Sequence, residues 1–163
     1  MTKKKISVTI PAPHLTLFQA TREGLPTLIV VNDTLLSFAA SAIFPWHLSV
    51  TFKAQELIEH GMPSLEESNF LSDLSGQIES VLLKSQVTKG APNTLLLARS
   101  TWNGTHRISF YVHDPKVAQA ELDKLAASKT WERQWTYAIQ QDAAWENASF
   151  LFQLFPQAKG FDA

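Results

Sequence analysis

Apolar and polar residues alternate with a period of two along several segments of the chain. The clearest segment extends from Trp46 to Lys53, and two more flank Asn103-Gly104. This period is typical of a β-strand with one buried and one solvated face. Asn-Gly suits the two positive φ angles of a type I′ turn, so the segments on either side of it are predicted to form a hairpin. A last alternating segment extends from Trp131 to Ile139.

The two-residue turn also predicts how the arms of the hairpin pair, because turn length fixes strand register. Trp102 is expected opposite Thr105, and Leu96 opposite Tyr111. The other surface of the hairpin would then face the core, with Leu95, Leu97, Ile108, Phe110 and Val112.

Two further segments repeat their apolar residues every three or four positions, as amphipathic helices do. The first, Leu65 to Lys84, begins after Ser64, which stands three residues before Glu67 in the spacing of a capping box. The second follows Asp114-Pro115, a good cap and a favoured first helical residue. The order from Trp46 to Gln140 is therefore strand, helix, strand, strand, helix, strand. It predicts an α+β fold, a ferredoxin-like βαββαβ two-layer sandwich with two helices on one face of an antiparallel sheet.

Residues 1–44 are predicted to extend this unit with an N-terminal β-hairpin. Leu15 to Ala20 and Thr27 to Val31 resemble strands, and the residues between them have turn chemistry. Periodicity does not decide between helix and strand for Leu35 to Phe44. Residues 45–155 are predicted to hold the ferredoxin-like unit and a short closing helix. The length of 163 residues is that of a single domain.

Composition excludes several classes of site and partner. The chain has no cysteine, which excludes disulfides, thiolate metal sites and cysteine nucleophiles. Fourteen basic and fifteen acidic residues give a formal net charge of -1, which favours neither a polyanion nor a membrane surface as partner. The sequence shows no transmembrane span and no export signal, so we expect a cytoplasmic protein.

No motif for catalysis or cofactor binding is evident. A nucleophile elbow, a P-loop and a dinucleotide-binding glycine fingerprint are all missing. The five histidines lack the spacing of metal ligands, and Glu66 and Glu67 are neighbours that diverge on a helix. We therefore predict no enzyme activity, no cofactor and no metal site. A small enzyme with an unrecognised site remains an alternative.

RNA binding is a second alternative, because ferredoxin-like sheets bind RNA through aromatic residues on the outer face of their two central strands. Those strands are predicted at Trp46 to Lys53 and Thr105 to His113, and only Tyr111 among their outward residues offers a flat stacking platform. The basic-glycine-aromatic pattern of RNA-binding sheets is missing from the second of them. Nucleic acid is therefore the less favoured partner.

Two surfaces are candidates for contact with a partner protein. At the hairpin tip, aromatic and basic side chains share one face, as in protein-binding anchors, although the N-terminal strands could also cover them. The first helix is acidic, which suits a partner with a basic surface, such as a toxin. The predicted partner-binding residues are Trp102, Arg107 and Tyr111 at the tip and Glu66, Glu67 and Asp73 on the helix.

Three short segments resemble a known family: Phe44-Pro45-Trp46-His47-Leu48, Phe110-Tyr111-Val112 and Asp142-Ala143-Ala144-Trp145. With these segments the chain resembles the uncharacterised bacterial family labelled domain of unknown function 695. It is more distantly similar to regulators of ribonuclease E of the RraB type, whose domain is also ferredoxin-like. The resemblance covers roughly Pro45 to Leu154, and it departs at Ala148, where such proteins tend to have an aromatic residue.

The resemblance implies an accessory domain without an established catalytic residue. Together with the missing motifs, it favours a non-catalytic protein-binding module that inhibits or regulates another protein, a toxin or an enzyme. An immunity-type protein that neutralises a toxin is the leading hypothesis. A regulator of RNA metabolism of the ribonuclease-inhibitor type is the alternative.

Overall fold

The computed structural model describes residues 9–155; the first eight residues of the predicted N-terminal extension and residues 156–163 lie outside the described part. The main sheet has six strands in the order β1-β2-β6-β7-β3-β8, all antiparallel to their neighbours. Its strands are β1 (Leu15–Arg22), β2 (Leu25–Asn32), β3 (Trp46–Lys53), β6 (Thr94–Trp102), β7 (Thr105–Val112) and β8 (Trp135–Gln141). β4 (Gln86–Thr88) and β5 (Ala91–Pro92) form a separate two-stranded sheet. The helices are α1 (Leu65–Lys84), α2 (Pro115–Ser128) and α3 (Glu146–Phe152).

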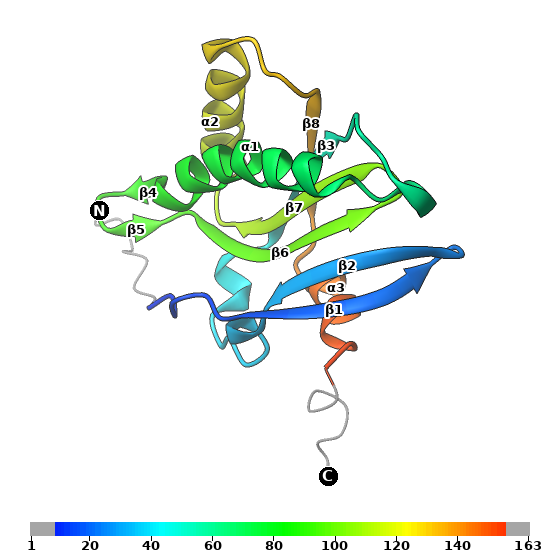
Figure 1. The fold of residues 1–163 in the computed structure, drawn as a ribbon. Coiled ribbons are helices and arrows are strands. Elements are labelled where there is room, and N and C mark those ends of the chain that lie inside the picture. Colours follow the sequence, from blue (N-terminus) through cyan, green and yellow to red (C-terminus); the bar gives the residue numbers. More distant parts are fainter. Residues whose placement is uncertain (1–8, 156–163) are drawn as a thin grey trace, which may run out of the picture.

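The predicted mixed fold of helices and an antiparallel sheet is confirmed. α1 and α2 lie on one side of the sheet, and α3 lies on the other (Figure 1). The sheet is two strands wider than the four-stranded sheet predicted, because the N-terminal hairpin joins it through pairing of β2 with β6. This pairing satisfies backbone groups of β6 that would otherwise have no partner.

Each face of the sheet has its own apolar core. The helix-covered face, which packs against α1 and α2, buries among others Leu74 of α1 and Phe110 of β7. The opposite face, which we call the rear face, carries a second cluster around Tyr111, Phe44 and Trp145. We call this cluster the rear core. It joins residues that lie far apart in the sequence, because α3 folds back across the sheet.

The first helix begins and ends where the sequence predicts. Its N-cap is confirmed, since the Glu67 backbone N–H donates to the Ser64 hydroxyl at 3.1 Å. The reciprocal half of the predicted capping box is wrong. The Glu67 carboxylate accepts a hydrogen bond from the Gln55 backbone N–H at 2.7 Å and binds Arg133, because a charged donor is a stronger partner than a cap amide.

The predicted hairpin turn is confirmed, with φ angles of 43° at Asn103 and 76° at Gly104. The register near the turn is as predicted, but a bulge in β6 pairs Leu95, rather than Leu96, with Tyr111. A bulge adds one residue to one strand and so reverses the alternation beyond it. The prediction that Leu95 and Leu97 face the helix-covered core is therefore wrong. Both lie in the rear core, and Leu96 lies under α1 and α2.

The segment from Leu35 to Phe44 contains neither a long helix nor a strand. A short 3-10 turn, Asp33–Leu35, ends at its first residue, and a second, Ser41–Ile43, lies within it; Leu35 and Phe44 are buried in the rear core. The last strand is shorter than predicted and begins at Trp135. Trp131 precedes it and packs against the core of the helix-covered face.

Candidate functional site

One end of the rear face, beside the Asn103-Gly104 turn, is not covered by the rear core. Arg107 lies opposite Ser100, and Trp102 lies opposite Thr105, so their side chains share this face. Lys53 pairs with Thr105 from the other side. Arg22, at the end of β1, lies over Trp102. We call these four residues the Trp102 surface: Arg22, Lys53, Trp102 and Arg107.

Trp102 is half-buried and held in place by the N-terminal hairpin. Its indole Nε1–H donates to the Arg22 carbonyl at 3.0 Å, and the Arg22 guanidinium carbon lies 4.4 Å from the ring centroid, in a cation–π contact. The sequence left two possibilities for Trp102, which were cover by the N-terminal strands and contact with a partner. The structure combines them. The hairpin covers part of the ring, and the rest of the side chain is accessible.

The positive charges of the Trp102 surface have no carboxylate partners within residues 9–155. The ion pairs of this part of the chain are Glu79–Arg99, Glu132–Lys129 and Glu67–Arg133, and the His14 imidazole lies against the Asp33 carboxylate. Arg107 instead donates to the Thr51 hydroxyl at 3.3 Å. Partial burial and the nearby charge of Arg22 both lower the pKa of Arg107. The surface is thus suited electrostatically to an acidic partner.

A rigid apolar loop stands next to this surface. Leu57 and Ile58 are 48% and 62% exposed in the loop that precedes α1. The loop is fastened to the hairpin turn, since the Gly104 N–H donates to the Gly61 carbonyl at 2.6 Å. Gly61 has a φ of 76°, and a Cβ there would lie 2.9 Å from the Asn103 side-chain oxygen, so only glycine fits. Exposed apolar side chains on a fixed loop are typical of protein contacts.

A hollow of about 460 Å³ lies between this loop and the ends of β3, β7 and β8. Its lining combines Lys53 of the Trp102 surface with Leu57 of the loop. Basic and apolar groups therefore meet at one end of the molecule, where three connecting loops gather (Figure 1).

Tyr111 is not part of this exposed surface, and the prediction that it binds a partner is wrong. It is fully buried and stacks on Trp145, with ring centroids 4.1 Å apart and planes 8° apart. Its hydroxyl donates to the Asp142 carboxylate at 2.7 Å and accepts from the Ala148 backbone N–H at 3.1 Å. Burial, and then the hydrogen bond to Asp142, raise the pKa of Tyr111. The sequence did not show that α3 would cover it.

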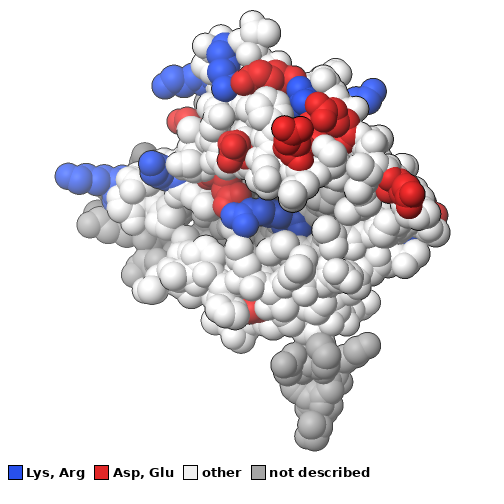
Figure 2. Space-filling view, in the orientation of Figure 1, with Lys and Arg blue, Asp and Glu red and all other residues white. Residues whose placement is uncertain are grey.

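The acidic helix is only partly as predicted. Glu67 is buried, and its carboxylate forms a two-fold contact with Arg133 at 2.7 and 2.8 Å. The hydrogen bond from Arg133 lowers the pKa of Glu67 to about 2, against the opposing effect of burial. The prediction that Glu67 contacts a partner is therefore wrong. Glu66 and Asp73 are exposed. Figure 2 shows acidic side chains spread over the region of α1 and α2, on the side of the molecule seen in Figure 1.

Sequence reasoning missed Arg22 and Lys53. Lys53 stands at an outward position of a predicted strand, so its place on the sheet surface was available from the pattern. The position of Arg22 above Trp102 depends on the pairing of β2 with β6, which no local pattern indicates.

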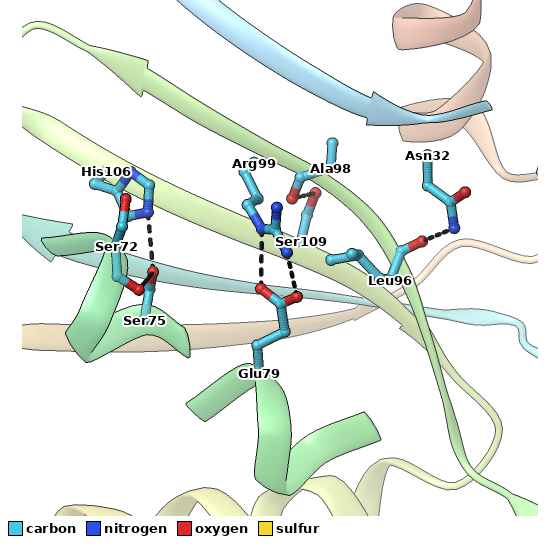
Figure 3. Close-up of polar contacts among 9 residues, drawn as sticks. All are labelled: Asn32, Ser72, Ser75, Glu79, Leu96, Ala98, Arg99, His106 and Ser109. Atoms are coloured by element: carbon cyan, nitrogen blue, oxygen red, sulfur yellow. Dashed lines mark hydrogen bonds and ion pairs between the residues drawn. The ribbon is translucent and has the colours of Figure 1, made fainter. Parts of the chain in front are cut away.

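A serine–histidine contact below α1 is the nearest approach to a catalytic arrangement (Figure 3). The Ser75 hydroxyl lies 3.1 Å from Nε2 of His106, as in a nucleophile–base pair. Ser75 is only 2% exposed, and the other ring nitrogen of His106 faces the Thr101 hydroxyl rather than a carboxylate. The contact therefore satisfies buried polar groups between α1 and β7.

The hollow beside this contact has a volume of about 350 Å³ and is lined by α1 and by Arg99 of β6. Arg99 is paired there with Glu79, so neither charge is free to act on a ligand (Figure 3). Within residues 9–155, no three histidine, aspartate or glutamate side chains come together as metal ligands. In the same part of the chain, no helix is long and apolar enough to cross a membrane.

The family model described as "Family of unknown function (DUF695)" matches residues 16–152. The chain belongs to this family. The DUF695 match begins in β1 and ends with α3, so it includes nearly all of the N-terminal hairpin, the Trp102 surface, the helix-covered core and the rear core except Phe155. The match begins earlier in the chain than the resemblance found from the sequence, which began at about Pro45. No curated protein and no solved structure matches the chain.

The segments that suggested DUF695 meet in the rear core. Nε1 of Trp145 donates to the Phe44 carbonyl at 2.8 Å, and Trp145 stacks on Tyr111. The Asp142 carboxylate accepts a hydrogen bond from the Tyr111 hydroxyl. It also caps α3 by accepting hydrogen bonds from the backbone N–H groups of Glu146 and Asn147. At least one residue of each segment therefore helps to hold α3 on the sheet, while Leu48, Phe110 and Val112 lie in the core of the helix-covered face.

Proposed function

We propose that this chain is a non-catalytic protein-binding module that acts in the cytoplasm as an inhibitor or regulator of another protein. An immunity-type protein that neutralises a toxin is its leading form. The observation that carries the proposal is the Trp102 surface, where a tryptophan under Arg22 shares one sheet face with Arg107 and Lys53, and none of the three cations has a carboxylate partner in residues 9–155. Tryptophan and arginine are the residues most often found at the energetic centre of protein interfaces.

The neighbouring apolar loop supports a protein partner. Leu57 and Ile58 are exposed beside the basic residues, and the loop is fixed on the hairpin turn. An interface commonly combines an apolar centre with a charged rim that sets partner choice and association rate. We infer a partner whose contact surface is acidic at its rim.

We also infer that β3, α1, β6, β7, α2 and β8 form a ferredoxin-like unit. Two observations support this inference. The four strands lie in the order β6-β7-β3-β8, with the first and third strands of the unit in the centre. Both helices of the unit lie on one side of the sheet (Figure 1).

Affinity capture with charge-reversed variants tests the proposed surface. We expect the unmodified chain to retain a specific protein from a lysate of its native host, as identified by mass spectrometry. Arg107→Glu should weaken the affinity of that purified protein at least tenfold, because it replaces a cation of the Trp102 surface with a carboxylate that repels an acidic partner. Asp73→Lys, a charge reversal of equal size and opposite sign on the exposed face of α1, should leave the affinity unchanged.

Three outcomes would contradict the proposal. Retention of no specific protein would count against a binding module, and equal binding by Arg107→Glu would exclude the Trp102 surface. A loss of affinity with Asp73→Lys but not with Arg107→Glu would show that the partner contacts α1 instead. Retention of ribonuclease E would support the more distant similarity to RraB-type regulators.

RNA binding is the second candidate, because cations without a carboxylate partner among the described residues and a tryptophan on one sheet face also suit a single strand. The burial of Tyr111 removes the predicted stacking platform, and Arg22 occupies one face of Trp102. If RNA is the ligand, a labelled single-stranded oligonucleotide should bind with an affinity that falls steeply with salt concentration, and Arg107→Ala should reduce that slope. Absence of binding at low salt would remove this candidate.

A further inference from the structure

β1 forms one edge of the main sheet, and its outer side pairs with no other strand within residues 9–155. It is eight residues long and pairs with β2 without a bulge. From Leu15 to Thr21 it contains neither a charged residue nor a proline. Bulges, charges and prolines are the usual features that prevent an edge strand from pairing with another chain. Apart from Arg22 at its last position, β1 lacks all three and is therefore open to a further strand.

The side chains of this edge are also apolar and exposed. Leu15 is 39% and Leu17 is 60% exposed, and Leu28 of the adjoining β2 is 36% exposed. They lie on the same face of the sheet, because Leu17 is opposite Val30 and Leu28 is opposite Gln19. The opposite edge differs, since β8 exposes Thr136, Ala138 and Gln140. Exposed leucines along an unpaired strand indicate a surface that becomes covered.

We propose that β1 pairs with β1 of a second copy of this chain, antiparallel and centred on Phe18, to form a two-fold dimer with one continuous sheet. A second copy suits this edge because the strand is uncharged between Leu15 and Thr21, so that self-pairing brings no like charges together. The axis through Phe18 makes the contact self-complementary, as a two-fold interface requires. Leu17 then lies opposite Gln19 of the second copy, and the two Leu17 side chains become diagonal neighbours.

The ends of the paired strands are complementary in charge. In this register Arg22 lies opposite His14 of the second copy. His14 is 2.6 Å from the Asp33 carboxylate, which also accepts a hydrogen bond from the Thr16 hydroxyl. Each end of the two-fold pair therefore brings an arginine close to a carboxylate. A parallel pair would instead bring the two Arg22 residues together. Arg22 belongs to both surfaces, whereas Trp102 and Arg107 lie on β6 and β7, so the dimer leaves them accessible.

Molar mass in solution tests the dimer. Light scattering on the full chain should give twice the chain mass of 18.2 kDa. Leu17→Lys should raise the dissociation constant at least tenfold, because two lysines would become neighbours across the pair. Leu65→Lys introduces the same change at a side chain that is 77% exposed on α1, and it should leave the dimer intact. A monomeric unmodified chain, an unchanged dissociation constant in Leu17→Lys or equal weakening by both variants would each overturn the proposal.

The register is tested by cross-linking, which the absence of natural cysteine makes clean. Leu17→Cys and Gln19→Cys chains, purified separately, mixed and oxidised, should form mixed disulfides in preference to either self-pair. Directly opposite residues are close enough for a disulfide, whereas diagonal neighbours are too far apart. Self-linked Leu17→Cys chains as the main product would overturn the register centred on Phe18. Both experiments measure self-association alone, so their result is separate from that of the Trp102 surface.

Discussion

Replacing Trp145 with alanine should lower the free energy of unfolding by about 3–5 kcal/mol, as large-to-small changes of buried tryptophans do. Trp145 is only 6% exposed and stacks on Tyr111 with ring centroids 4.1 Å apart. It also donates its indole N–H to the Phe44 carbonyl, which would be left without a partner in the variant. Urea unfolding followed by far-ultraviolet circular dichroism measures the change, since this signal does not depend on the tryptophan removed.

Phe150→Ala is the matched control. Phe150 lies in the same helix, α3, but its side chain is 73% exposed. Its replacement should change stability by no more than about 0.5 kcal/mol. If Trp145→Ala cost less than about 1 kcal/mol, α3 would contribute little to the stability of the sheet, and the rear core would not be a part of the cooperative fold.

Local signals in the sequence were sufficient for most elements. Ser64 marked the start of α1, and Asn103-Gly104 marked the β6–β7 turn, because each depends on backbone chemistry within a few residues. The bulge in β6 was not predictable in the same way. No glycine or proline marks it, and it moved Leu95 and Leu97 to the rear core.

The candidate site was less predictable because its members come from distant parts of the chain. Trp102 and Arg107 lie in one hairpin, so register alone placed them on one face. Tyr111 shares that face but is buried there under Trp145, and the burial of Glu67 depends on Arg133. Contacts between such distant residues have no signature in local periodicity. The candidate site in the structure is therefore the Trp102 surface, without Tyr111 and Glu67.

Stability should fall as the pH is lowered from 7 to 4.5, mainly because of His106. Burial, and then the positive charge of Arg99, lower the pKa of His106 from 6.5 to about 4. The unfolded chain therefore binds a proton more readily than the folded chain. The stabilisation is complete above about pH 6.5 and is lost as the pH falls towards 4. A shift of this size corresponds to about 3 kcal/mol at its full extent.

Between pH 6.5 and 4.5 the pH dependence of stability comes from the histidines rather than from the buried carboxylates. Glu67 and Asp142 have ordinary pKa values of 4.5 and 3.8, and both are lowered to about 2 in the folded chain. In Asp142, hydrogen bonds from Tyr111 and α3 outweigh the opposing effect of burial. Their stabilisation is present above the unfolded values and is lost only as the pH falls from about 4.5 towards 2. Burial also lowers the pKa of His47, which adds to the effect of His106 in the same direction.

Urea unfolding at pH 7 and pH 4.5 should show a loss of about 2–3 kcal/mol in the unmodified chain. His106→Gln should be less stable at pH 7, because it disturbs the contacts with Ser75 and Thr101, but it should lose most of the dependence on pH. His47→Gln should retain most of that dependence, since His106 is the more strongly shifted group. If His106→Gln does not fold, the change in stability of the unmodified chain between pH 7 and pH 4.5 still tests the prediction. Constant stability between pH 7 and 4.5 would mean that the imidazole of His106 accepts a proton within the folded protein as readily as in water.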